Sequence, residues 1–130
     1  MKELLKQIFG SKKNIENTIE SHFHESKSIE EFKKLGSEAR FKNIMILGDT
    51  GQAEYLDLLK YCISNDPDAD VKFAALKRIH LFEKSEVINF LTQLQDSAIV
   101  SELEPYFSMA LSRTGIISIE EFENRINGGQ

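Results

Sequence analysis

The chain has 130 residues, of which 41% are hydrophobic, with two prolines, one cysteine and a formal net charge of −5. This length suits a single domain with a continuous core, and the lone Cys62 excludes an internal disulfide. No segment approaches the roughly 18 apolar residues that a membrane-spanning helix needs. We therefore expect a soluble, cytoplasmic domain.

Residues 1–36 are expected to form an N-terminal helical extension. The first nine residues place apolar side chains on one stripe of a short first helix, with lysines nearby. A second helix is expected at about residues 12–26, where apolar residues recur every four positions. The first helix either caps the open end of the fold, which we favour, or anchors the chain to anionic lipid. The stripe consists of Leu4, Leu5, Ile8 and Phe9.

The central part of the chain, residues 37–115, carries a period of 32 residues. A fixed period of this length is typical of repeated supersecondary units that bury their faces on one another. Apolar residues hold the register at two positions: Ala39, Val71 and Leu103 at the first, and Leu47, Ile79 and Leu111 at the second.

Each period is expected to contain two helices. Residues 46–51 match residues 110–115 two periods later, and both runs have the pattern of a helix end followed by a glycine turn. Between them, the apolar residues of 55–59 match those of 87–91 at the 32-residue offset. A second helix therefore follows each turn.

Four start signals mark the beginnings of helices along the chain. Ser28 with Glu31, and Ser118 with Glu121, have the spacing of capping boxes. Residues 66–70 offer a cap, a helix-starting proline and acidic residues suited to a helix N-terminus. Pro105 has to lie in or near the first turn of its helix.

The stretch from Ile46 to Ile79 resembles a HEAT-like repeat. The resemblance covers about residues 38–82 and extends more weakly over 83–115, and it implies a right-handed stack of antiparallel helix pairs whose second helices line a concave surface. In such repeats an Asp in the turn and a basic residue after the Val tie neighbouring units together. Arg40 and Lys72 match that basic position, whereas Glu104 occupies it in the third unit.

The predicted fold is therefore all-α: a short right-handed α-α superhelix, or HEAT-like solenoid, of about three helix pairs with helical end caps. Residues 37–115 form the repeats, and residues 116–130 form a C-terminal capping helix and tail. With so few repeats, a homodimer through an open end of the stack is one way to cover its exposed face.

The charge distribution bears on the partner. Residues 1–82 hold 13 acidic and 13 basic residues, whereas residues 83–130 hold 8 acidic and 3 basic. This balance argues against nucleic acid, which requires several cations on one face. The one candidate basic patch comprises Lys33, Lys34, Arg40, Lys42, Lys72, Lys77 and Arg78. The acidic C-terminal third instead suits a partner with a basic surface, and in size and charge the chain resembles immunity-type inhibitors of basic toxins.

No catalytic, cofactor-binding or metal site is expected. His22 and His24 would point to different sides of one helix, and His80 belongs to another unit. Residues 114–122 imitate the second half of an EF-hand loop, but the first half fails, because Ala110 stands where the calcium loop needs an Asp. We interpret Ser118 and Glu121 as a helix cap instead.

The expected function is that of a non-catalytic protein–protein interaction module, a small scaffold or adaptor. Phe41 and Phe73 occupy equivalent positions, and they either pack between helices as core, which we favour, or anchor a partner on the concave face. The candidate partner-binding residues are Arg40, Phe41, Lys72, Phe73 and Glu104. Besides the toxin inhibitor, the alternatives are a repair-related nucleic-acid binder and a lyase-like HEAT protein with a tetrapyrrole pocket.

Overall fold

The computed structural model describes residues 28–127, and no β-strand occurs in this range. The predicted all-α class is confirmed for this part, whereas the predicted N-terminal helices fall outside it. Its α-helices are α3 (Ile29–Lys33), α4 (Ser37–Thr50), α5 (Leu56–Asn65), α6 (Ala69–Arg78), α7 (Lys84–Leu94), α8 (Val100–Leu103), α9 (Tyr106–Arg113) and α10 (Ile119–Asn127). Two 3-10 turns, η1 (Ala53–Tyr55) and η2 (Ile79–Leu81), precede α5 and follow α6.

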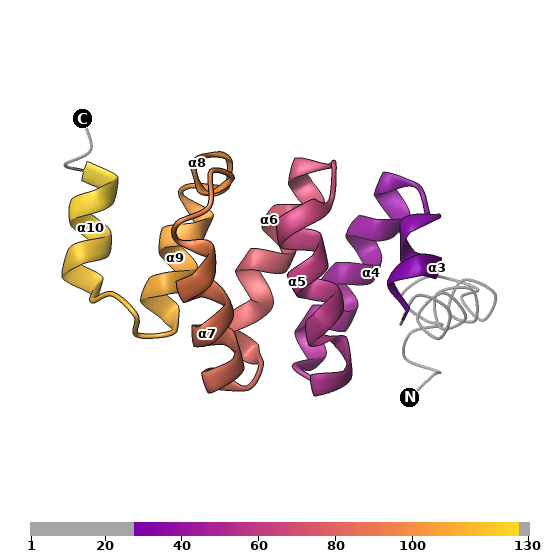
Figure 1. Cartoon of the computed structure of the whole chain (residues 1–130), viewed down its shortest axis with the longest axis horizontal. Helices are drawn as coiled ribbons and strands as arrows, with labels where there is room; N and C mark the ends of the chain where they lie inside the picture. Colours follow the sequence, from indigo (N-terminus) through magenta and orange to yellow (C-terminus); the bar gives the residue numbers. More distant parts are fainter. Residues whose placement is uncertain (1–27, 128–130) are drawn as a thin grey trace, which may run out of the picture.

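The helices follow one another in chain order along the long axis of the molecule (Figure 1). Helix α6 packs against α4 on one side and α9 on the other, and also against α5. Helices that the 32-residue period makes equivalent are therefore neighbours in space. Helices α4 with α5, and α6 with α7, each fill one period, which confirms the prediction of two helices per period. The right-handed HEAT-like superhelix stays a prediction from the sequence.

The residues that define the period lie in one continuous apolar core. Val71, Ile79, Leu103 and Leu111 are fully buried, Leu47 is 2% exposed, and only Ala39, the smallest of the six, is half-buried. Burying a side chain of this size stabilises the fold by roughly 1.5–3 kcal/mol. The recurring apolar residues therefore mark the contacts that join successive helices.

Two glycines let α6 and η2 approach the C-terminal end of α4 closely. A Cβ on Gly48 would lie 2.9 Å from Cδ of Arg78, and one on Gly51 would lie 2.8 Å from the carbonyl oxygen of Leu81. Gly51 also has a φ of 65°, in the left-handed region that glycine adopts without strain. Gly115, after α9, has a φ of 82°. Both predicted glycine turns are confirmed.

The predicted helix starts are largely confirmed. The Ser28 hydroxyl accepts the N–H of Glu31 at 3.1 Å, and the Ser118 hydroxyl accepts that of Glu121 at 3.0 Å. Asp68 is the N-cap of α6, and its carboxylate accepts the N–H groups of Asp70 and Val71. Because Asp68 takes this position, the preceding proline lies outside the helix and does not start it as expected.

The C-terminal part is less regular. Leu103 ends the short helix α8, and α9 begins only at Tyr106, so the third unit has a break where α4 and α6 are continuous. Helix α10 buries no side chain completely, and Ile119 and Ile126 remain 69% and 45% exposed. This terminal helix is therefore held by far less apolar contact than α6.

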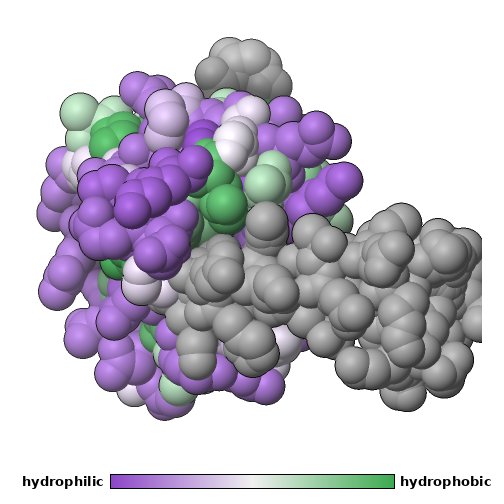
Figure 2. All heavy atoms as spheres, turned by 90° about the vertical axis from the view of Figure 1, so that its right-hand side faces the viewer, coloured by the Kyte–Doolittle hydropathy of each residue, from purple (hydrophilic) through white to green (hydrophobic). Residues whose placement is uncertain are grey.

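At the opposite end of the stack, which begins with α3, the visible surface of the described residues is mostly hydrophilic, with small hydrophobic areas among polar side chains (Figure 2). Within residues 28–127, no helix combines the length and the apolar character that crossing a bilayer requires.

Candidate protein-binding surface

Three neighbouring helices, α4, α6 and α9, enclose a surface hollow of about 390 Å³. Each of them contributes one aromatic ring, namely Phe41, Phe73 and Tyr106. We call this hollow the aromatic groove. Its complete lining is Phe41, Met45, Asp70, Phe73, Ala74, Lys77, Arg78 and Tyr106.

The rings of the aromatic groove pack on the core and also face the hollow. Phe73 and Tyr106 have centroids 4.6 Å apart with planes tilted by 41°, a favourable arrangement for two aromatic rings. Phe41, Phe73 and Tyr106 are all half-buried. The two phenylalanines were expected either in the core or on an open face. In the structure, each of them packs on the core and also faces the open hollow.

Opposite charges occupy the two ends of the groove. Asp70 lies in the first turn of α6, and Lys77 lies in its last turn, with Nζ 4.7 Å from the centroid of Tyr106. At the Asp70 end the groove continues into a hollow of about 240 Å³ that Glu38 and Asp68 also line. At the Lys77 end, Arg78 pairs with Asp49 at 3.0 Å. The groove therefore has an acidic end and a basic end.

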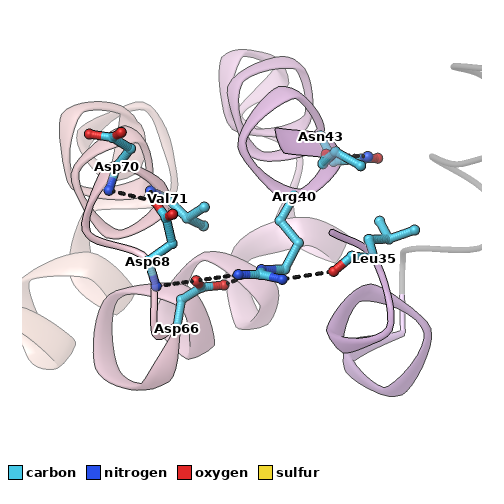
Figure 3. Close-up of polar contacts among 8 residues, drawn as sticks. Leu35, Arg40, Asn43, Asp66, Asp68, Asp70 and Val71 are labelled. Atoms are coloured by element: carbon cyan, nitrogen blue, oxygen red, sulfur yellow. Dashed lines mark hydrogen bonds and ion pairs between the residues drawn. The ribbon is translucent and has the colours of Figure 1, made fainter. Parts of the chain in front are cut away.

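Arg40 does not line this groove, and it connects two units (Figure 3). Its guanidinium donates to both carboxylate oxygens of Asp66, at 2.8 and 3.1 Å, and to the carbonyl oxygen of Leu35 at 2.7 Å. The hydrogen bond to Asp66 raises the pKa of Arg40, which keeps the cation charged. Asp66 is 1% exposed and also accepts the N–H of Asp68. This pair ties α4 to the turn between α5 and α6.

Lys72 and Glu104, the other charged residues predicted to bind a partner, also make contacts within the chain. Lys72 pairs with Glu102 at 3.5 Å, which links α6 to α8. Glu104 accepts the N–H and the hydroxyl of Ser108, at 3.0 and 2.8 Å, in the first turn of α9. Neither residue lines the aromatic groove.

Of the predicted binding residues, the structure therefore brings only Phe41 and Phe73 together in one hollow. Sequence reasoning missed Tyr106, because the position equivalent to Phe73 in the third unit is Pro105. The ring lies one residue later, after the break between α8 and α9. A search that allowed a one-residue shift at the proline would have found it.

The candidate basic patch is largely neutralised by acidic neighbours. Five of its seven members form ion pairs, which leaves Lys34 and Lys77 without such a partner among residues 28–127. Cations held by carboxylates are poorly placed to release the counterions of a phosphate backbone. The pairs are Lys33–Glu30, Arg40–Asp66, Lys42–Glu38, Lys72–Glu102 and Arg78–Asp49.

The groups with reactive side chains lie in structural surroundings. Cys62 is fully buried in the core, and burial raises the pKa of its thiol. Burial, together with the nearby Arg113 cation, lowers the pKa of His80. In the EF-hand-like segment, α9 continues to Arg113, so the first half of that motif is helix. Within the described part of the chain, no three potential metal ligands lie together.

Comparison with known proteins finds no matching family model, curated protein or solved structure. The assignment of the groove therefore depends on its own geometry and charges, and the resemblance to HEAT-like repeats stays a prediction from the sequence.

Proposed function

We propose that this chain is a non-catalytic protein-binding module that holds a segment of a partner protein in the aromatic groove. The observation that carries the proposal is the row of half-buried rings, Phe41, Phe73 and Tyr106, around a hollow of about 390 Å³. Aromatic residues in such a setting commonly provide most of the binding energy of a protein interface. Three rings from three helices give a partner one continuous apolar contact.

The charges of the groove support a protein partner over a nucleic acid. Lys77 is an exposed cation in the groove, but the exposed carboxylate of Asp70 lies on the same lining. Arg78 is already paired with Asp49. A phosphate backbone needs several unpaired cations along one track, whereas protein surfaces carry both signs.

The test compares two aromatic substitutions in the full-length chain, Phe73→Ala and Phe90→Ala. Both rings are half-buried, but Phe90 lies on α7, outside the groove. Proteins retained from a lysate of the source organism by the unmodified chain should also be retained by Phe90→Ala and lost with Phe73→Ala. For the isolated complex, we expect Phe73→Ala to raise Kd about 30-fold, as for a central aromatic anchor.

Thermal unfolding of both variants provides the control for folding. A partner that Phe73→Ala holds as tightly as the unmodified chain would contradict the proposal. So would a partner lost equally with Phe90→Ala, or an unmodified chain that retains no protein at all.

A further inference from the structure

We infer that the partner segment is an amphipathic helix that places a basic side chain over Asp70 and an acidic one over Lys77, with apolar side chains between them. This inference rests on the proposed function, because it specifies which segment the aromatic groove accepts. It follows from the spacing of the groove residues on α6 and from the charges at their ends.

The groove residues of α6 form one longitudinal stripe. Asp70, Phe73, Ala74 and Lys77 stand at positions i, i+3, i+4 and i+7, which share one face of a helix. Seven residues of α-helix span about 10 Å. The Cα atoms of the exposed Asp70 and the exposed Lys77 are thus about 10 Å apart along α6, with Phe73 between them in the stripe.

Both charged groups are open to a partner. Asp70 and Lys77 form no ion pair with any other residue of the described chain, in contrast to Arg78 beside them. The backbone N–H groups near Asp70 are already capped by Asp68. The contact of Lys77 with the Tyr106 ring holds its ammonium group at the groove.

A helix fits this spacing better than an extended peptide. Side chains on one face of an extended strand recur about every 7 Å, so residues about 10 Å apart point to opposite faces. Residues i and i+7 of a helix are about 10 Å apart and point to the same face. A partner helix lying along α6 can therefore meet both charges, and its i+3 and i+4 side chains then reach the rings.

The experiment selects helix-forming peptides from a displayed library against the full-length chain. Positions 1, 4, 5 and 8 of one helical stripe are randomised over all residue types, and the flanking positions are kept constant. We expect the unmodified chain to enrich opposite charges at positions 1 and 8, with apolar residues at 4 and 5. Asp70→Lys should enrich acidic residues at both ends, and Lys77→Glu should enrich basic residues at both ends.

Matched charge reversals outside the groove are the controls. Asp57 is the second residue of α5, as Asp70 is of α6, and Lys84 is an exposed lysine of α7. Asp57→Lys and Lys84→Glu should enrich the same peptides as the unmodified chain. For one such peptide, each groove reversal should raise Kd roughly two- to tenfold, and less at high salt, as expected for exposed charge pairs.

Two other outcomes would overturn the inference. If peptides lose binding with Phe73→Ala but carry the same end charges for every variant, the groove binds partners without reading charge, and the proposed function survives. If no enriched peptide depends on Phe73, the groove does not accept a helix. The lysate experiment then decides separately whether the proposed function also fails.

Discussion

Neighbouring helices are held together by different contacts at the two ends of the described stack. Where α4 meets α6, Gly48 and Gly51 allow close contact, and ion pairs add to it, including Arg78–Asp49 and the buried Arg40–Asp66. Where α9 meets α10, no side chain of α10 is fully buried. Arg125 of α10 donates to the Ser108 hydroxyl of α9 at 3.2 Å.

This contrast explains the 32-residue period in physical terms. The period is strict where equivalent helices such as α4 and α6 bury residues at the same positions of the repeat, for example Val71 and Ile79. It weakens at Glu104, where an acidic residue replaces the basic one and bonds within its own unit. The apolar positions of the repeat therefore follow the packing between helices as far as Leu111, whereas the charged position of the repeat already changes at Glu104.

The largest expected effect comes from the tie between α4 and the α5–α6 turn. Arg40→Met leaves the carboxylate of Asp66, which is 1% exposed, without its cation. Removing one partner of a buried pair costs about 3 kcal/mol or more, because an uncompensated charge stays buried. We expect a corresponding fall in the free energy of unfolding, measured in urea.

Lys72→Met is the matched control, since Lys72 occupies the equivalent position one period later. Its partner Glu102 is 67% exposed, so water can replace the lost cation. The expected loss is under about 1 kcal/mol. Equal losses for the two variants would mean that the Arg40–Asp66 pair is no stronger than a surface pair.

The two glycine turns provide the next comparison. Gly51→Ala places a residue with a Cβ in the left-handed backbone region. That Cβ would also lie 2.8 Å from the carbonyl oxygen of Leu81. Gly115→Ala carries the same backbone strain, but nothing lies within 4 Å of the added atom. We expect losses of about 2 kcal/mol or more for Gly51→Ala and about 1 kcal/mol for Gly115→Ala.

The urea midpoints of the two variants measure this difference. If Gly115→Ala were as destabilising as Gly51→Ala, backbone strain alone would explain both losses. Close packing of α4 on η2 would then have no separate role.

The helical architecture could be predicted largely from local patterns. The apolar spacing and the glycine turns correctly indicate helices α4 to α7, and the serine caps correctly indicate the starts of α3 and α10. The resemblance also implied a tie between an Asp in a turn and a basic residue, and the Arg40–Asp66 contact has that form.

The candidate site was less predictable, because a groove depends on how helices distant in the chain are placed. Arg40 and Lys72 looked available for a partner in the sequence, but their charges are used by Asp66 and Glu102, which lie 26 and 30 residues further along the chain. Tyr106 was hidden by the break at Pro105. Neither fact follows from the local pattern around each residue.

The smallest expected effect concerns α10. Ile119 is 69% exposed, so Ile119→Ser should change the free energy of unfolding by less than about 0.5 kcal/mol.

The same loose contact should let α10 open separately from the core. Its amide hydrogens should therefore exchange faster than those of α6, which packs against α4, α5 and α9. Native-state hydrogen exchange followed by NMR measures both helices in one sample. Amides of α10 protected as strongly as those of α6 would show that the terminal helix shares the stability of the core, and the two ends of the stack would then differ in contact but not in cooperativity.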